Sequence, residues 1–200
     1  MKLSDYIAQF LVDQGVKHAF VLSGGAAVHM IDSVARNPHI EYVCSQHEEQ
    51  EAMAADAYAR VTGNLGVGIT TSGPGGTNLL TGVCCSYFDS IPALFLTGQV
   101  ARFRLKPTAS MRQMGFQETD MESIYKSVTK YTARVLDPSM IRYELEKAVY
   151  YAREGRPGPV LLDIPDDLQR EEIDPDSLKG FVPEVSESDV DFSASVWCGY

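Results

Sequence analysis

The sequence has little positive charge and no long apolar run. Lys and Arg number 17 against 27 Asp and Glu, for a formal net charge of −10. The basic residues form neither a cluster nor a stripe, which argues against binding to a nucleic-acid backbone or an anionic membrane surface. Nor does any apolar segment approach the roughly 20 residues needed to cross a bilayer. These absences favour a small molecule as the partner.

Cysteine is also scarce, and its four positions have neither metal-ligand spacing nor the density of a disulfide framework. They are Cys44, Cys84, Cys85 and Cys198. The first 15 residues alternate apolar and polar side chains, unlike the basic and then apolar start of a secretory signal. We therefore expect buried, reduced thiols in a cytoplasmic protein, with no metal site of its own.

What is present fits one globular domain with an extension. A hydrophobic fraction of 44% with 22% charged residues is ordinary for a folded protein, and 200 residues can bury a sizeable core. After Pro165 the chain turns to Asp, Glu, Ser and Pro without a hydrophobic period. We predict a folded domain over residues 1–167 and an exposed acidic linker or extension over residues 168–200.

Short apolar runs alternate with segments of helical periodicity along the domain. Strands are expected at residues 18–22, 40–44, 66–71, 92–97, 129–135 and 159–164. Helices are expected at residues 4–15, 28–34, 48–60, 77–88 and 137–149. This alternation predicts an α/β fold, a parallel sheet with helices on both faces. The aperiodic residues 98–119 predict a long functional loop.

In such sheets ligands bind beyond the carboxyl ends of the strands. Four segments follow predicted strands and should meet at this rim: residues 23–25, 46–48, 72–76 and the start of the loop at 98. Glu48 stands out because it lies between a strand and a helix. An acid in the first turn of a helix is often explained by the helix dipole alone. At a ligand-binding rim it is also a candidate catalytic group.

A glycine-rich turn runs from Thr71 to Asn78, with the sequence Thr-Ser-Gly-Pro-Gly-Gly-Thr-Asn. The dinucleotide-binding pattern needs glycine where Asn78 stands, and a P-loop needs Gly-Lys-Ser/Thr after the turn. Nucleotide binding is therefore disfavoured. The turn is either a tight connection before a helix or a place where backbone approaches another ligand closely.

The segment from His47 to Arg60 resembles the helix of thiamine diphosphate enzymes in which one glutamate activates the cofactor. Four further segments, in the same order, are similar to the acetolactate synthase family: residues 23–26, 71–78, 89–100 and 116–120. The resemblance covers roughly residues 4–166 and implies the pyrimidine-binding domain of such an enzyme. It implies that Glu48 is catalytic and hydrogen-bonds the aminopyrimidine ring. Glu49 and Glu51 are offset from the motif and are interpreted as solvated helix charges.

The resemblance also implies further site residues. The cofactor-binding residues would be Glu48, Ser72, Gly73, Pro74, Gly75 and Asn78. The substrate pocket would include Gly25, Phe116 and Gln117; the alternative is that these are a core aromatic and ordinary loop residues. Mg²⁺ would bind through an absent C-terminal domain, because no Gly-Asp-Gly occurs here. FAD, if the complete enzyme has it, would not be bound by this chain, and the subunits would form a homo-oligomer, a dimer or larger.

The implied function is half of an active site that decarboxylates a 2-oxo acid such as pyruvate and joins the product to a second carbonyl. The loop at 98–119 lacks the adjacent histidines typical of pyruvate decarboxylases, which favours carboligation. Ser23, Gln46 and Gly76 replace the proline, arginine and alanine common in acetolactate synthases. Two alternatives therefore stay open: a related lyase or carboligase with another substrate, and a non-catalytic binding or assembly domain.

Overall fold

The computed structural model describes residues 1–183, which fold around one parallel sheet. The six strands lie in the order β2-β1-β3-β4-β6-β5, and every pairing is parallel. Their bounds are β1 (His18–Val21), β2 (Glu41–Cys44), β3 (Gly66–Thr70), β4 (Ala93–Gln99), β5 (Tyr131–Arg134) and β6 (Pro159–Pro165). All six strands were predicted from the sequence, with ends that differ by a few residues.

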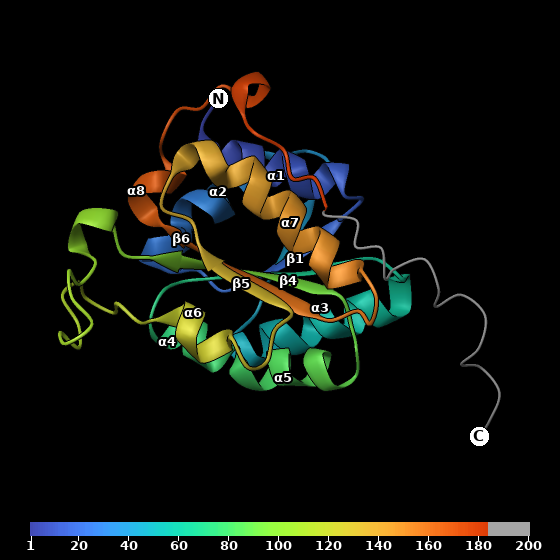
Figure 1. Cartoon of the computed structure of the whole chain (residues 1–200). Helices are drawn as coiled ribbons and strands as arrows, with labels where there is room; N and C mark the ends of the chain where they lie inside the picture. The colour runs from blue at the N-terminus through green and yellow to red at the C-terminus, as the bar shows by residue number, and fades with distance from the viewer. Residues whose placement is uncertain (184–200) are drawn as a thin grey trace.

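Helices cover both faces of the sheet, which confirms the predicted α/β fold (Figure 1). One layer contains α1 (Leu3–Asp13), α2 (Val28–Arg36), α7 (Ile141–Arg153) and α8 (Asp166–Gln169). The other contains α3 (Glu48–Thr62), α4 (Pro74–Asn78), α5 (Leu80–Phe88) and α6 (Met121–Tyr125). Short 3-10 turns complete the chain: η1 (Gly25–Ala27), η2 (Arg102–Arg104), η3 (Pro138–Met140) and η4 (Pro175–Ser177).

Two hydrophobic cores lie on opposite faces of the sheet. Strands β3, β4 and β6 are buried along their whole length, as expected for central strands covered on both sides. Because side chains alternate along a strand, Leu94 and Leu96 of β4 join the core under α1 and α7, whereas Phe95 joins the core under α3 and α5.

The helix α3 has clear start and stop signals. His47 is its N-cap and accepts a hydrogen bond at Nδ1 from the Glu49 N–H at 3.2 Å. Gly63 ends it in the left-handed conformation, with φ of 69°. Small residues allow α5 to approach closely, since a Cβ at Gly82 would lie 2.5 Å from Ala52 Cβ. The helix is therefore held firmly between the sheet and α5.

The glycine turn differs from its prediction. A helix was expected over residues 77–88 after a turn at 72–76, but α4 already begins at Pro74, and Leu79 separates it from α5. Proline suits the first turn of a helix because its missing N–H would have no partner there. The turn itself is reduced to Ser72 and Gly73.

The segment after Pro165 is only partly as expected. Up to residue 183 it is not an exposed linker throughout: Leu168 and Leu178 are buried in the core, and the Leu3 N–H donates to the Glu171 carbonyl oxygen at 2.8 Å. Residues 171–173 thus pair with the start of α1, and Phe181 packs against Tyr143 and Tyr150 of α7. Residues 184–200 lie outside the described part, and the boundary at 167 stays a prediction.

The expectation of buried cysteines is wrong for Cys44, which is exposed, while Cys84 and Cys85 are half-buried. The reason is position: Cys44 ends β2, an edge strand whose four residues are all exposed. All three are free thiols, and Cys198 lies outside the described residues. Among residues 1–183, none of the helices has the length and apolar character required to cross a bilayer.

Candidate functional site

The segments predicted to share the strand-end rim do meet there. The 23–25 segment contacts the glycine turn, since a Cβ at Gly24 would lie 2.4 Å from Thr71 Cβ. The same stretch contacts the end of β4, where a Cβ at Gly98 would lie 2.0 Å from the Ala26 carbonyl oxygen. The long loop that follows β4 projects from this end of the sheet (Figure 1). Both glycines are needed because any side chain would collide with neighbouring atoms.

Glu48 lies at this rim as the first residue of α3, and its side chain is 7% exposed. Asn78, the last residue of α4, donates its Nδ2–H to Glu48 Oε2 at 3.0 Å. The bond joins two segments that are 30 positions apart in the chain. The two residues with the most specific expected roles, activation and cofactor binding, are therefore brought into direct contact.

The glycine turn and the long loop touch at a strained point. Gly73 has a φ of 62°, and a Cβ there would lie 2.8 Å from Gln117 Cβ. Gln117 itself has a φ of 64°, unusual for a residue with a side chain. Ser72, Gly73 and Gly75 are buried, and Pro74 is exposed. Such strain is retained where the surrounding structure imposes it, often at ligand sites.

Glu118 holds the long loop together from inside. Its carboxylate accepts hydrogen bonds from three backbone N–H groups, those of Lys106 and Met114 at 2.8 Å and of Gly115 at 3.3 Å. Burial raises the pKa of Glu118, but these donors and the Lys106 charge outweigh it and lower the pKa below its usual value. The carboxylate thus holds Met114 and Gly115, the two residues before Phe116, close to Glu118.

A second buried carboxylate, Asp163, ties the loop to the sheet. It accepts hydrogen bonds from Thr97 Oγ1 at 2.8 Å, Gln99 Nε2 at 2.9 Å and Arg134 Nε at 2.8 Å. Gln99 Nε2 also donates to the Thr119 carbonyl oxygen at 2.8 Å. The network anchors both ends of the loop, which begins after Gln99 and ends at α6.

The proposed substrate residues are placed differently from one another. The Phe116 side chain is 84% exposed, so the alternative of a core aromatic is wrong. Gly25 is exposed, and a Cβ there would meet no atom within 4 Å. Gln117 is half-buried against the glycine turn. All three lie beside the rim, and their part in a substrate pocket stays a prediction.

Glu51 is the residue that sequence reasoning misjudged. The interpretation as a solvated helix charge is wrong, because its side chain is 0% exposed. It lies one turn after Glu48, on the face of α3 that also buries Ala52, Ala55 and Ala59. That apolar stripe has the spacing of a buried helix face and was the available signal.

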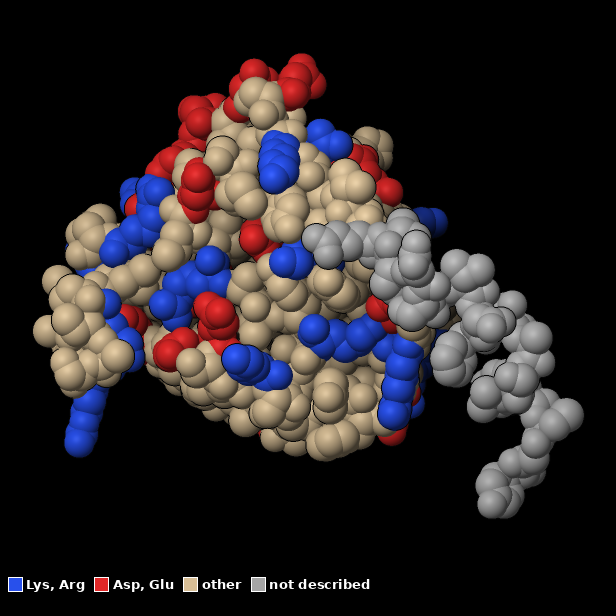
Figure 2. All heavy atoms as spheres, viewed as in Figure 1, with Lys and Arg blue, Asp and Glu red and all other residues tan. Residues whose placement is uncertain are grey.

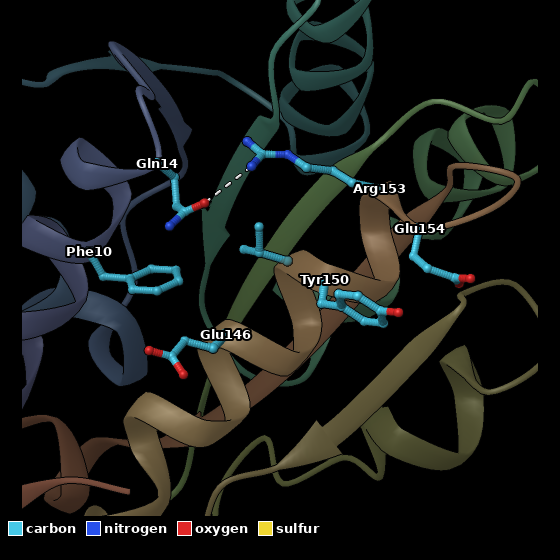
Figure 3. A pocket seen from close by; sticks show the side chains of 7 residues that line it. Phe10, Gln14, Glu146, Tyr150, Arg153 and Glu154 are labelled. Atoms are coloured by element: carbon cyan, nitrogen blue, oxygen red, sulfur yellow. Dashed lines mark hydrogen bonds between the residues drawn. The ribbon is translucent and has the colours of Figure 1, made fainter. Parts of the chain in front are cut away.

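The cavity in Figure 3 lies elsewhere, between α1 and α7. Its volume is about 440 Å³, and Arg153 crosses it to bond Gln14 Oε1 at 3.2 Å. Phe10, Val149 and Tyr150 form its apolar wall. None of the predicted site residues lines it, so the candidate site is an open rim and not this cavity.

Charge on the visible face is mixed, as the sequence suggests. Figure 2 shows Lys and Arg spread among Asp and Glu, with acidic side chains gathered at the top near the N-terminus and η4. The basic side chains on this face form no continuous stripe like those that bind nucleic acids.

Comparison with known proteins identifies the class of this fold and site. Residues 1–124 match the family described as thiamine pyrophosphate enzyme, N-terminal TPP binding domain, and the chain belongs to this family. Thiamine pyrophosphate is another name for thiamine diphosphate, so the family resemblance seen in the sequence is confirmed.

The similar curated proteins are acetolactate synthases. Acetolactate synthase 2, chloroplastic, of Nicotiana tabacum is 39% identical over 175 residues, which cover 88% of this chain and 26% of the relative. The isozyme 3 large subunit of Escherichia coli is 40% identical over 165 residues, covering 82% of this chain and 28% of the relative. The chain thus spans about a quarter of the length of these relatives.

Proposed function

We propose that this chain supplies the pyrimidine-binding half of the active site of a thiamine diphosphate-dependent carboligase. One observation carries the proposal: Glu48 is buried at the strand-end rim and is oriented there by Asn78. Burying a carboxylate is costly, and an assembly domain would gain nothing from doing so at a ligand-binding edge. The site therefore favours an enzyme over a non-catalytic binding domain.

The residues at the rim fit an aminopyrimidine ring. Asn78 binds one carboxylate oxygen of Glu48, and the second is suited to a hydrogen bond with a ring nitrogen. Gln117 and Thr71 occupy the space that side chains at Gly73 and Gly75 would take, so the backbone of the turn is fixed in place, and we propose that it faces the ring. Ser72 and Pro74 complete the turn beside them.

When bound, thiamine diphosphate supplies an acidic thiazolium carbon and a sink for the electrons released as a 2-oxo acid loses CO₂. The chain's own contribution is to hold and move one proton. Glu48 carries that proton at the ring nitrogen, as a general acid positioned by hydrogen bonding. Asn78 keeps the carboxyl group in one orientation. Gly25, Phe116 and Gln117 would border the substrate beside it.

The relatives support pyruvate, or a similar 2-oxo acid, as the donor substrate and carboligation as the reaction. Mg²⁺ and the diphosphate would be held by another domain or chain, and FAD, if present, likewise. The active unit would be a homo-oligomer, a dimer or larger. We place the protein in the cytoplasm, where an exposed thiol such as Cys44 stays reduced.

The test is Glu48→Gln in the enzyme assembled with its diphosphate-binding half. The amide keeps the shape of the side chain but cannot exchange the required proton. Proton exchange at the thiazolium carbon, followed by NMR, should fall by about 10²- to 10⁴-fold, with cofactor affinity largely kept.

Glu49→Gln is the matched control, because Glu49 is the next residue of the same helix turn and is less buried. It should leave the exchange rate near that of the wild type. Wild-type exchange in Glu48→Gln would show that another group activates the cofactor and would overturn the proposal.

A further inference from the structure

A second glutamate lies buried beneath Glu48. Both carboxyl oxygens of Glu51 are inaccessible to solvent, and neither has a hydrogen-bonding partner of normal geometry within the described chain. Thr70 Oγ1, at the end of β3, is another buried oxygen without a hydrogen-bonding partner in the described part of the chain. Buried polar groups almost always have partners, so the unpartnered carboxyl group of Glu51 requires an explanation.

The space for the Glu51 carboxyl comes from a missing side chain. Its Oε1 lies 3.0 Å from where a Cβ of Gly68 would be, in the middle of β3. The ring of Phe95, on β4, also lies against this position: its Cδ1 is 2.9 Å from where the Cβ of Gly68 would be. The carboxyl group is thus enclosed between α3 and the centre of the sheet, in apolar surroundings.

These surroundings favour the neutral acid. Burial raises the pKa of Glu51 well above its usual value, and the neighbouring charge of Glu48 raises it further. The N–H groups of Leu22 and Ile69 lie near enough to lower the pKa, but by less. No cation is among the groups that act on it.

Two other titratable groups on this side of the sheet, Tyr125 and Cys84, also favour their neutral forms. Burial raises the pKa of the Tyr125 phenol on α6, and both Cys84 and Glu51 add to the effect. Burial also raises the pKa of the Cys84 thiol on α5. Neither of these two groups would compensate a charge on Glu51.

Glu48 and Glu51 are three positions apart on α3, so their side chains leave the same face of the helix one turn apart. The charge of Glu48 and the deeper burial of Glu51 both favour the protonated form of Glu51.

We propose that Glu51 is a positioning residue for Glu48: its buried carboxyl stays uncharged beside Glu48 and thereby sets the alkaline limit of cofactor activation. The inference rests on the proposed role of Glu48. Once Glu51 loses its proton, its negative charge opposes the transfer of a proton from Glu48 to the ring nitrogen. Activation then declines although every group that touches the cofactor is unchanged.

The protonation state of Glu51 can be measured without the cofactor. Infrared spectra of the 200-residue chain near neutral pH should contain a carboxylic-acid C=O band, which disappears in Glu51→Gln and persists in Glu49→Gln. The wild-type band should also vanish when the pH is raised. Absence of the band in the wild-type chain would overturn the proposal, whatever the variants do.

Stability provides a second readout. Because folding raises the pKa of Glu51, its stabilising contribution is present below the usual glutamate pKa and is lost as the pH rises toward the raised value. The free energy of unfolding of Glu51→Gln relative to wild type should therefore increase over this range. A difference that does not change with pH contradicts the proposal. If Glu51→Gln does not fold, Glu51→Leu replaces it.

The pH profile of the assembled enzyme separates this inference from the proposed function. Wild-type exchange at the thiazolium carbon should fall by about tenfold per pH unit above the Glu51 transition, and Glu51→Gln should not show this fall. The same alkaline fall in both proteins would overturn the role of Glu51. Full exchange in Glu48→Gln would instead overturn the proposed function, while the infrared result would stand by itself.

Discussion

Asn78 donates its side-chain amide to the carboxylate of Glu48, and this 3.0 Å bond joins the end of α4 to the start of α3. The contact depends on the early start of α4 at Pro74, which brings Asn78 to the rim as the last residue of that helix. Asn78 is thus a partner of the glutamate that we propose activates the cofactor, as well as a proposed cofactor-binding residue.

Asn78→Ala should slow proton exchange at the thiazolium carbon by about 10- to 100-fold, because a hydrogen bond to a charged group contributes roughly 1.5 to 3 kcal/mol. Cofactor affinity, measured by calorimetry, should change less. Thr77→Ala, at the exposed neighbouring position, is the control. Equal losses in the two variants would show that α4 itself had been damaged.

Phe116→Ala should alter the choice of acceptor substrate more than it alters cofactor affinity. The ring is 84% exposed beside the rim, where it can form one wall of a pocket with a second domain or subunit. Losing an aromatic wall is worth about 1 to 3 kcal/mol of discrimination. The measurement is the ratio of products from competing acceptors.

Phe103→Ala is the matched control, because Phe103 is 70% exposed in the same loop but lies on η2. Unchanged product ratios in Phe116→Ala, across several acceptors, would remove Phe116 from the substrate site.

Much of this arrangement could be predicted from the sequence because it depends on local patterns. A buried apolar run such as Pro159–Pro165 between helical segments indicates a central strand, and Glu48 opens a helix a short turn after β2. The meeting of the rim segments then follows from the parallel sheet.

What could not be predicted depends on long-range contacts. The burial of Glu51 requires the missing side chain of Gly68, which is distant in sequence. The left-handed conformation of Gln117 is imposed by contact with Gly73 and by the bonds of Glu118, and no residue preference signals it. The split between α4 and α5 likewise contradicts the continuous apolar pattern of 77–88.

Glu118→Ala should loosen the long loop between β4 and α6 without unfolding the domain. Three backbone N–H groups lose a charged acceptor, at a local cost of about 1 to 3 kcal/mol. Amide hydrogen exchange of Lys106 and Gly115 should accelerate in the variant. Glu122→Ala, which removes an exposed acid from the start of α6, should have no such effect.

The loop should also loosen in acid. Because the folded pKa of Glu118 is lowered, its stabilising contribution is present above the usual glutamate pKa of about 4.3 and is lost as the pH falls through the folded value. The protection of the same amides, measured relative to their intrinsic exchange rate at each pH, should therefore fall at low pH in wild type more than in Glu118→Ala. Parallel pH dependences would show that the carboxylate does not control the loop.

The 200-residue chain should self-associate through the 72–88 region and bind thiamine diphosphate only weakly. The weak binding follows from the proposal that the strongest charge-assisted contacts, those to the diphosphate and Mg²⁺, are made elsewhere. Leu79 and Val83 cannot form this interface, since they are 0% exposed and belong to the core. The exposed apolar groups on α5 are Tyr87 and Phe88.

Phe88→Ser should therefore shift the sedimentation of the chain toward the monomer, because the Phe88 ring is 65% exposed and would be covered in the dimer. Phe103→Ser removes an equally large ring from the long loop between β4 and α6 and should leave the association unchanged. Calorimetric titration with the cofactor and Mg²⁺ tests the other half of the prediction. Tight stoichiometric binding by a monomer would show that the chain holds a complete site, and identical sedimentation of both variants would place the interface outside α5.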